Sequence, residues 1–228
     1  MVTEQAERHY RDEAGARYQF EKRAIPEGTI AWVARTRAEK ISRHVRASDA
    51  VLEYGAGFGW NLAGLKCARR LAFDLEDYLP APVRAAGVEF IADTKAVPDA
   101  TLEVVLCHHA LEHLPHPAAG LEEMARLLRS GGKLLLFVPL ERERKYGRFD
   151  AAEPNHHLFS WNAQTLGNLT EAAGFRVVEA GTGPFGYDRF AAAWAVKLGA
   201  GELGFRRLRR SLQILRRTRE VRIVAERQ

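Results

Sequence analysis

The stretch VLEYGAGFGW (residues 51–60) carries three glycines at alternate positions directly after a short apolar segment. The apolar residues predict a buried strand that ends near Tyr54. The glycines predict a sharp turn, because a residue without a Cβ adopts unusual backbone angles at little cost and lets the backbone approach a ligand. Glu53 therefore places a carboxylate at the end of a strand, beside a turn without side chains.

Short apolar segments alternate with amphipathic ones along the rest of the chain. We expect further strands at residues 71–74, 88–93, 104–107, 134–138, 175–179 and 221–225. We expect helices over residues 30–45 (capped by Thr29), 60–69, 121–128 (stopped by the serine and glycines at 130–132) and 162–174 (capped by Asn162). Continuous apolar strands separated by helices are typical of a parallel sheet covered on both faces. The sequence therefore predicts a doubly wound α/β fold.

The spacing of the glycines distinguishes two kinds of nucleotide-like cofactor. A dinucleotide fingerprint reads G-x-G-x-x-G and places the pyrophosphate on the N-terminus of the next helix. Here Gly59 follows Gly57 after a single residue, and Trp60 stands where the third glycine of that fingerprint belongs. A carboxylate at Glu53 opposes a pyrophosphate but suits a cationic cofactor. The turn favours S-adenosylmethionine, which carries a sulfonium and an ammonium group, over a nicotinamide dinucleotide.

Residues 53–59, E-Y-G-A-G-F-G, resemble the E/D-x-G-x-G-x-G signature of class I S-adenosylmethionine-dependent methyltransferases. Residues 107–114 are similar to the fourth-strand motif of that family, and residues 129–133 to its glycine turn. Residues 157–175 resemble the subgroup that includes quinone-biosynthesis and sugar methyltransferases. The resemblance implies a Rossmann-like methyltransferase fold, in which a seven-stranded, mostly parallel sheet has an antiparallel last strand.

The resemblance also implies which residues bind the cofactor. Asp74 matches the acid that hydrogen-bonds the ribose, and Leu75 matches the apolar residue against the adenine. Asp93 and Thr94 match the pair beside the adenine amino group, and His108 is expected to offer its backbone to the ammonium group. The complete expected set is Glu53, Tyr54, Gly55, Ala56, Gly57, Gly59, Asp74, Leu75, Asp93, Thr94 and His108. No metal is expected.

Methyl transfer to a hydroxyl or to an acidic C–H also requires a base, and histidine is the side chain that titrates near neutral pH. The histidines near the expected site are His108, His109, His113, His156 and His157. His109 is the candidate catalytic base, because it should lie at the mouth of the sheet. In a zinc H-E-x-x-H motif the glutamate adjoins the first histidine, whereas Glu112 adjoins the second, His113. His113 is expected to bond backbone, and His156 and His157 could equally pack their loop.

The chain divides into an expected N-terminal helical arm or cap (residues 1–47) and an S-adenosylmethionine-binding domain (48–228). The domain is expected to contain a basic helical insertion at about 181–219. The acceptor pocket is expected between the arm, the loop 139–160 and this insertion. The expected acceptor is a small molecule, methylated on a hydroxyl.

The positive charge of the chain is concentrated in one segment. The net charge is +5, yet residues 206–219 hold seven arginines and no acid. Phe205, Leu208, Leu212 and Leu215 recur at helical spacing, and we interpret the segment as a surface helix packed on the sheet edge by its leucines, with solvated arginines. The alternatives are docking on RNA or on an anionic membrane, methylation of RNA or protein, and a cofactor-binding scaffold without turnover.

The composition suits a globular protein, with 46% hydrophobic and 28% charged residues. The charged N-terminus is not expected to be a signal peptide. Cys67 and Cys107 have no metal-binding spacing, so both are expected to be buried, reduced thiols in a cytoplasmic protein.

Overall fold

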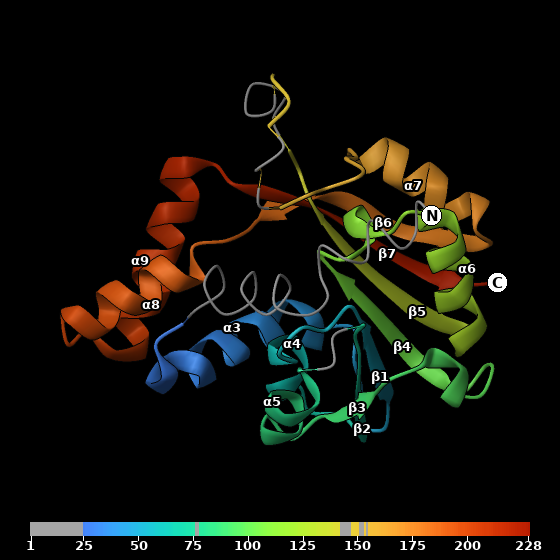
Figure 1. Cartoon of the computed structure of the whole chain (residues 1–228), viewed down its shortest axis with the longest axis horizontal. Coiled ribbons are helices and arrows are strands. Elements are labelled where there is room, and N and C mark those ends of the chain that lie inside the picture. The colour runs from blue at the N-terminus through green and yellow to red at the C-terminus, as the bar shows by residue number, and fades with distance from the viewer. Residues whose placement is uncertain (1–24, 76–77, 142–146, 151–152, 154) are drawn as a thin grey trace.

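A seven-stranded sheet forms the centre of the protein, with helices on both faces (Figure 1). The computed structural model describes residues 25–75, 78–141, 147–150, 153 and 155–228. The strands are β1 (Ala50–Tyr54), β2 (Arg69–Phe73), β3 (Glu89–Ile91), β4 (Leu102–His108), β5 (Leu128–Pro139), β6 (Phe175–Pro184) and β7 (Arg219–Arg227). Their order is β3-β2-β1-β4-β5-β7-β6, and β7 runs antiparallel to both of its neighbours. The predicted doubly wound sheet with an antiparallel last strand is confirmed.

The helices fall into three groups. The α-helices are α3 (Ile30–Ser42), α4 (Trp60–Ala63), α5 (Pro80–Ala85), α6 (Pro117–Leu127), α7 (Ala163–Ala172), α8 (Asp188–Lys197) and α9 (Gly201–Arg216). Single 3-10 turns are η2 (Glu27–Thr29), η3 (Thr94–Ala96) and η4 (Leu111–His113). Helices α6 and α7 lie on one face of the sheet and α3, α4 and α5 on the other, while α8 and α9 project to one side (Figure 1).

The apolar strands bury both of their faces, as the continuous hydrophobic segments predict. In β4, Val105 and Cys107 pack toward α6 and α7, whereas Val104 and Leu106 pack toward the opposite helices. All four side chains are buried. This alternation explains why the strand has no polar face in the sequence.

Helices α8 and α9 pack on α3 rather than on the sheet. Phe205 of α9 and Val33 of α3 are fully buried in a separate apolar cluster with Ala191, Ala192 and Ala195 of α8. Both helices lie between β6 and β7, and β6 continues to Pro184, beyond the expected end of that strand. The cluster fixes the two helices beside the carboxyl ends of the central strands.

Several helix boundaries differ from the sequence predictions. Asn162 caps α7 as predicted, and its side chain accepts the Thr165 N–H at 2.9 Å. Thr29 does not cap α3, because its hydroxyl instead donates to the Pro26 carbonyl at 2.7 Å within the preceding turn. Helix α4 ends after one turn at Ala63, short of the expected residue 69. Gly64 follows it and lies so close to α3 that a Cβ there would come within 2.9 Å of the Ala34 carbonyl oxygen.

The glycine turn at 130–132 lies inside β5 and does not stop a helix. Helix α6 ends at Leu127, and Leu128 already pairs with Leu102 of β4. The register then shifts before Lys133 pairs with Val104, so residues 129–132 form an irregular segment of the strand. Among the described helices, none combines the length and the apolar character needed to cross a bilayer.

Candidate functional site

The residues predicted to bind the cofactor gather at the carboxyl ends of the parallel strands, where ligands bind in doubly wound sheets. Glu53 and Tyr54 end β1, Asp74 follows β2, Asp93 follows β3 and His108 ends β4. The adjacent pairing of β1 with β2 and β4 brings three of these strand ends together. Segments far apart in the sequence therefore meet at one edge.

The glycine turn has a backbone that only glycine adopts readily. Gly55, Gly57 and Gly59 have φ of 74°, 52° and 71°. The Gly55 N–H donates to the Phe73 carbonyl at 2.9 Å, which holds the turn against the end of β2. A Cβ on Gly55 would lie 2.3 Å from the Cβ of Ala110, so the turn also touches the segment after β4.

Two carboxylates face this turn from neighbouring strands. Asp74 accepts the Gly57 N–H at 2.7 Å and the Leu75 N–H at 2.8 Å. Glu53 is fully buried and accepts a hydrogen bond from the Asn61 side chain at 2.5 Å. The buried Glu53 and the half-buried Asp74 carboxylates make this edge of the sheet electronegative, and residues 53–60 contain no lysine or arginine.

The remaining predicted cofactor residues have local structural roles as well. Asp93 caps the turn η3 by accepting the Lys95 N–H at 2.9 Å, and Thr94 is buried in that turn. Leu75 is 44% exposed and is therefore available for an apolar contact. Tyr54 packs on Phe73 with 4.8 Å between ring centroids, and burial raises the pKa of its hydroxyl to about 12.

His108 and His109 stack on each other at the end of β4, with 4.5 Å between ring centroids. His109 has a φ of 55°, a left-handed conformation that is uncommon for a residue with a Cβ. The strand ends there, and this conformation turns the His109 ring onto Phe185, at 4.1 Å between centroids. The His109 Nε2 donates to Glu220 Oε2 at 3.1 Å.

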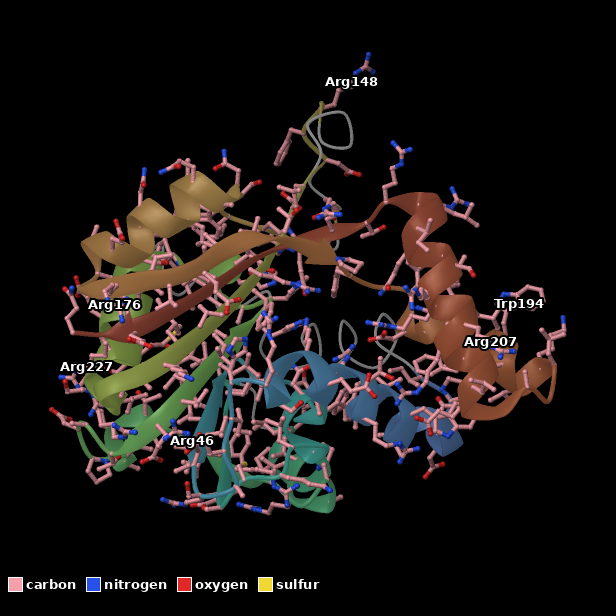
Figure 2. All side chains as sticks on the ribbon, turned by 180° about the vertical axis from the view of Figure 1, so that it is seen from behind. Arg46, Arg148, Arg176, Trp194, Arg207 and Arg227 are labelled. Carbon is pink, nitrogen blue, oxygen red and sulfur yellow. The ribbon has the colours of Figure 1, made fainter. Side chains whose placement is uncertain are left out.

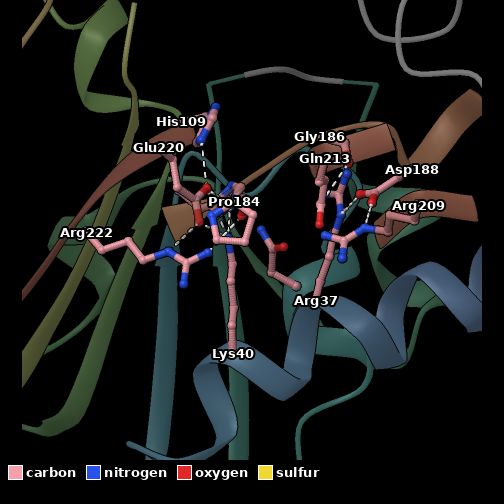
Figure 3. Close-up of polar contacts among 12 residues, drawn as sticks. Arg37, Lys40, His109, Pro184, Gly186, Asp188, Arg209, Gln213, Glu220 and Arg222 are labelled. Atoms are coloured by element: carbon pink, nitrogen blue, oxygen red, sulfur yellow. Dashed lines mark hydrogen bonds and ion pairs between the residues drawn. The ribbon is translucent and has the colours of Figure 1, made fainter. Parts of the chain in front are cut away.

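Glu220 is the centre of a buried ionic group that we call the Glu220 network: Lys40, His108, His109, Glu220 and Arg222. Lys40 donates from Nζ to Glu220 Oε1 at 2.9 Å and to His108 Nε2 at 2.6 Å. Arg222 donates from Nε to Glu220 Oε1 at 2.9 Å. Figure 3 shows Lys40 reaching from α3 to Glu220, with His109 and Arg222 on other sides of the carboxylate.

The charges within this network are set by burial and by neighbours. Burial opposes ionisation of Glu220, but the neighbouring His108 and His109 rings and the charge of Lys40 hold its pKa well below its usual range. Burial lowers the pKa of Lys40 to about 8, although Glu220 acts in the opposite direction. Burial, and then the charge of Lys40, lower the pKa of His108 well below its usual value. His108 is therefore neutral at pH 7.

The ligand geometry of this network resembles a metal site, but a cation already occupies it. Single donor atoms of His108, His109 and Glu220 lie within 4.8 Å of one another. The Lys40 ammonium group bonds both His108 and Glu220, so it neutralises the carboxylate that a metal ion would need. This arrangement suits an ion-pair network that orients His109.

A second group of ligand atoms lies next to it. Glu112, His113 and His157 each offer one donor atom within 4.8 Å of the others. The Leu158 N–H donates to the Glu112 carbonyl at 2.9 Å, which brings the loop that carries His157 against η4. His157 Nδ1 bonds Glu141 Oε1 at 2.6 Å, as a metal-ligating histidine often bonds a carboxylate through its second nitrogen. These residues are the ones that could hold a metal ion.

A third ionic group joins α3 to the two outer helices. Asp188 accepts from Arg37 at 2.9 Å and from Arg209 at 2.6 Å (Figure 3). Burial opposes ionisation of Asp188, but the charges of Arg37 and Arg209 lower its pKa. Arg37 and Lys40 lie one turn apart on α3, so this helix connects α8 with β7.

A cavity of about 600 Å³ connects these groups. Its wall includes His108, His109, Glu112, His113 and His157, and also Trp60 from the end of the glycine turn. The opposite wall comes from the start of α8 and from the segment between α9 and β7, at Tyr187, Asp188, Arg189, Arg216, Arg217, Thr218 and Arg219. The predicted base therefore faces a chamber that is large enough for a small molecule.

The residues around the turn fit S-adenosylmethionine chemically. The three positive φ angles leave the backbone of the turn bare, and the two nearby carboxylates suit a cofactor with positive groups. Glu53, Asp74 and the amides of the turn are the residues that would hold it. The predicted base His109 and the turn are linked through Ala110, which follows His109 and contacts Gly55.

The sequence reasoning missed Glu220, Lys40 and Arg222. Glu220 is the second residue of the last strand, and because β7 is antiparallel, its beginning lies at the same edge as the carboxyl ends of the other strands. Glu220 pairs with Pro139, the last residue of β5. The expectation of an antiparallel last strand was the signal that could have identified an acid at its first residues as part of the site.

The fold and this site define a Rossmann-like methyltransferase domain. The family described as "Methyltransferase domain" matches residues 23–180. A probable S-adenosylmethionine-dependent methyltransferase of Mycobacterium tuberculosis is 32% identical over 165 residues, which cover 68% of this chain and 60% of the relative. A ubiquinone biosynthesis O-methyltransferase of Xylella fastidiosa is 34% identical over 113 residues, covering 44% of this chain and 46% of that protein.

Solved structures share the fold at low sequence identity. A putative methyltransferase from Bacillus halodurans matches with a TM-score of 0.59 at 19% identity, covering 84% of this chain and 97% of that one. The [4+2]-cyclase SpnF matches with a TM-score of 0.60 at 18% identity, covering 85% and 81%. One of these two neighbours is named a cyclase and the other a methyltransferase, so a shared fold does not define a reaction.

The chain belongs to the methyltransferase domain family. It spans about 60% of the length of the first curated relatives that it matches.

Proposed function

We propose that this protein is an S-adenosylmethionine-dependent methyltransferase that methylates a hydroxyl group of a small molecule. The observation that carries the proposal is that a bare glycine turn flanked by two carboxylates lies against Ala110, next to a histidine that lines a cavity of about 600 Å³. Membership of the methyltransferase domain family supports the cofactor. The ubiquinone biosynthesis O-methyltransferase among the relatives supports an oxygen acceptor.

S-adenosylmethionine supplies an electrophilic methyl group on a sulfonium when it is bound. In our proposal Glu53 attracts the positive groups of the cofactor and Asp74 accepts hydrogen bonds from its ribose hydroxyls. The backbone amides of the turn approach the cofactor without side chains between them. His108 offers backbone at the end of β4, and Leu75, Asp93 and Thr94 border the adenine. The chain then contributes mainly position and exclusion of water, which account for much of the rate of such a displacement.

His109 is the proposed base for the acceptor hydroxyl. Its Nε2–H is held by Glu220 at 3.1 Å, so the proton of the neutral ring lies on Nε2 and the lone pair on Nδ1. Nδ1 lies 4.0 Å from Glu112 Oε1, and both residues line the chamber. A proton taken from the acceptor would make the ring cationic, and the buried Glu220 carboxylate would stabilise that charge. Glu220 is thus a positioning residue.

The chamber supports a small acceptor rather than a polymer. Its volume is about 600 Å³, which is within the range of small-molecule sites. Polar groups are spread around its wall, including Asn155 and Thr218, and Phe185 provides an apolar surface beside His109. This mixture suits an acceptor with an aromatic or aliphatic body and one or more hydroxyl groups.

The cofactor is tested by calorimetric titration of the whole chain with S-adenosylmethionine and, separately, with NADH. We expect binding of the first alone, and a loss of about tenfold or more in Glu53→Gln, because a charged hydrogen-bonding partner is removed. Glu89→Gln is the matched control, since Glu89 forms an exposed pair with Arg69 at 2.7 Å away from the turn. Binding of NADH, or equal affinity of Glu53→Gln and wild type, would contradict the cofactor assignment.

The reaction is tested with isotope-labelled S-adenosylmethionine and a panel of hydroxylated and aminated small molecules. We expect label to be transferred to oxygen, located by mass spectrometry of the product. Label found on nitrogen would contradict the proposed hydroxyl acceptor and would indicate an N-methyltransferase instead. Tight cofactor binding with no transfer to any acceptor would favour the non-catalytic scaffold.

A further inference from the structure

The outer surface of α8 and α9 combines apolar and basic side chains in a way that the site does not use. Among the described residues, twelve large hydrophobic side chains are exposed, and seven of them lie between Phe190 and Leu215. Their exposed fractions range from 51% at Trp194 to 76% at Leu215. A concentration of this kind on so short a segment marks an interaction surface.

The exposed residues form one stripe on each of the two helices. On α8, Phe190 and Trp194 are four residues apart, and Leu198 follows four residues later, so the three share one side of the helix. On α9, Leu203, Arg207, Arg210 and Ile214 are spaced by four, three and four residues and share its outer side. We call these seven residues the docking face. Trp194 and Arg207 both lie on this outer pair of helices in Figure 2.

The arginines of α9 divide into two groups with different roles. Arg206 pairs with Glu202 at 2.9 Å, and Arg209 pairs with Asp188 at 2.6 Å, so both contribute to packing. Within the described part of the chain, Arg207 and Arg210 form no ion pair and point outward. The interpretation of the segment as a packed surface helix therefore holds for its inner side, at Phe205 and Leu208, but Leu215, which was expected to pack, is 76% exposed.

The charge of this region identifies the partner. Residues 189–217 contain eight lysines and arginines and one acid, a net charge of +7, whereas the whole chain has +5. The rest of the chain is therefore slightly acidic, at −2, and the excess positive charge belongs to the segment that carries the docking face. Lys197 lies over the Trp194 ring at 5.1 Å, so basic and aromatic groups are interleaved there.

We propose that the docking face binds the surface of an anionic lipid bilayer. The aliphatic and aromatic side chains enter the boundary between headgroups and acyl chains, while Arg207, Arg210 and Lys197 contact lipid phosphates. Nucleic acid is the less suitable partner, because Leu203 and Ile214 offer nothing to a phosphate backbone and stay in water when RNA is bound. The proposal is independent of the methyl-transfer reaction.

The test is co-sedimentation of the full chain with vesicles, measured at low and at high salt. We expect binding to vesicles of phosphatidylglycerol and phosphatidylcholine in equal parts, and little binding to phosphatidylcholine alone. Arg207→Gln with Arg210→Gln should weaken binding by about 25-fold, since each basic residue near an anionic membrane contributes about fivefold. Phe190→Ala with Trp194→Ala should weaken it by about tenfold or more, and this loss should persist at high salt.

Matched controls separate the docking face from general effects of charge and hydrophobicity. Arg46→Gln with Arg84→Gln removes two exposed arginines from other elements, and Val178→Ser removes an exposed apolar side chain from β6. Arg46 lies on a different part of the surface from Arg207 (Figure 2). Both controls should bind as the wild type does, and all variants should keep the wild-type unfolding midpoint.

Three results would overturn the proposal. The first is equal binding to charged and uncharged vesicles, and the second is equal losses in the control variants. The third is that another partner uses the surface. This would be seen as an RNA oligonucleotide that binds while vesicles do not, or as a dimer that dissociates in Phe190→Ala with Trp194→Ala.

Discussion

Replacing Glu220 by glutamine is the most direct perturbation of the site. Glu220 is fully buried and bonds Lys40, His109 and Arg222 at 2.9–3.1 Å. Glutamine keeps the shape of the Glu220 side chain but removes its negative charge. The largely buried Lys40 ammonium group is then left without its counter-ion. Breaking a buried pair on one side costs about 3–5 kcal/mol. Because domains are typically stable by about 5–15 kcal/mol, this loss is a large fraction of the total.

The assay is urea unfolding followed by tryptophan fluorescence. With a slope of about 2–3 kcal/mol per molar urea, Glu220→Gln should lower the midpoint by about 1–2.5 M. Glu226→Gln is the control on the same strand, since its pair with Arg176 is exposed and should contribute at most about 1 kcal/mol. The double variant Lys40→Met with Glu220→Gln should lose less unfolding free energy than the sum of the losses in the two single variants, because no lone buried ammonium group remains.

The pH dependence gives an independent check on the same residue. The folded-state pKa of Glu220 is well below its usual range, so the unfolded chain takes up a proton first as the pH falls. Its contribution to stability is therefore present above about pH 4.3 and is lost as the pH falls below that value. The difference in unfolding free energy between wild type and Glu220→Gln should shrink in this acidic range. A loss of less than about 1 kcal/mol of unfolding free energy in Glu220→Gln at pH 7 would refute the reasoning.

Four further outcomes are expected. His109→Asn should lower kcat by about 10²-fold or more in the methyl-release assay without weakening cofactor binding, because asparagine tolerates the φ of 55° but is no base. Gly57→Ala should lose calorimetric S-adenosylmethionine binding, whereas Gly131→Ala, equally left-handed at 69° but away from the site, should lose only stability. The stability of wild type relative to Lys40→Met should rise by up to about 3 kcal/mol from pH 8 toward pH 10.5, since the folded-state pKa of about 8 lies below the unfolded value. Dialysis against EDTA should leave methyl transfer unchanged, and a loss that Zn²⁺ or Mn²⁺ restores would instead indicate a metal at Glu112, His113 and His157.

The strands of the core were predictable because their pattern is local. Each buried strand is a continuous apolar segment. The carboxylate of Glu53 and the glycine turn both lie within residues 51–60, so the sequence shows them side by side. The cap at Asn162 was also predictable, because a capping interaction involves residues only three apart. The side-chain cap predicted at Thr29 was wrong, because the hydroxyl bonds the preceding turn instead, and the helix predicted over 60–69 ends already at Ala63.

The candidate site was only partly predictable. The roles assigned to Glu53, Asp74 and His109 stay predictions, and the structure brings these residues to one edge of the sheet. Glu220 was missed, because its importance depends on the direction of β7 and on a side chain that reaches it from α3.

The sequence by itself determined the sheet, the glycine turn and the sign of charge beside it, because these follow from side-chain chemistry and short spacing. Only the tertiary structure decided which distant groups meet. It placed Lys40 and Glu220 together across 180 residues of chain, and it separated the packed arginines of α9 from the outward ones. Such contacts depend on how elements pack on one another, and the one-dimensional order of residues does not encode them locally.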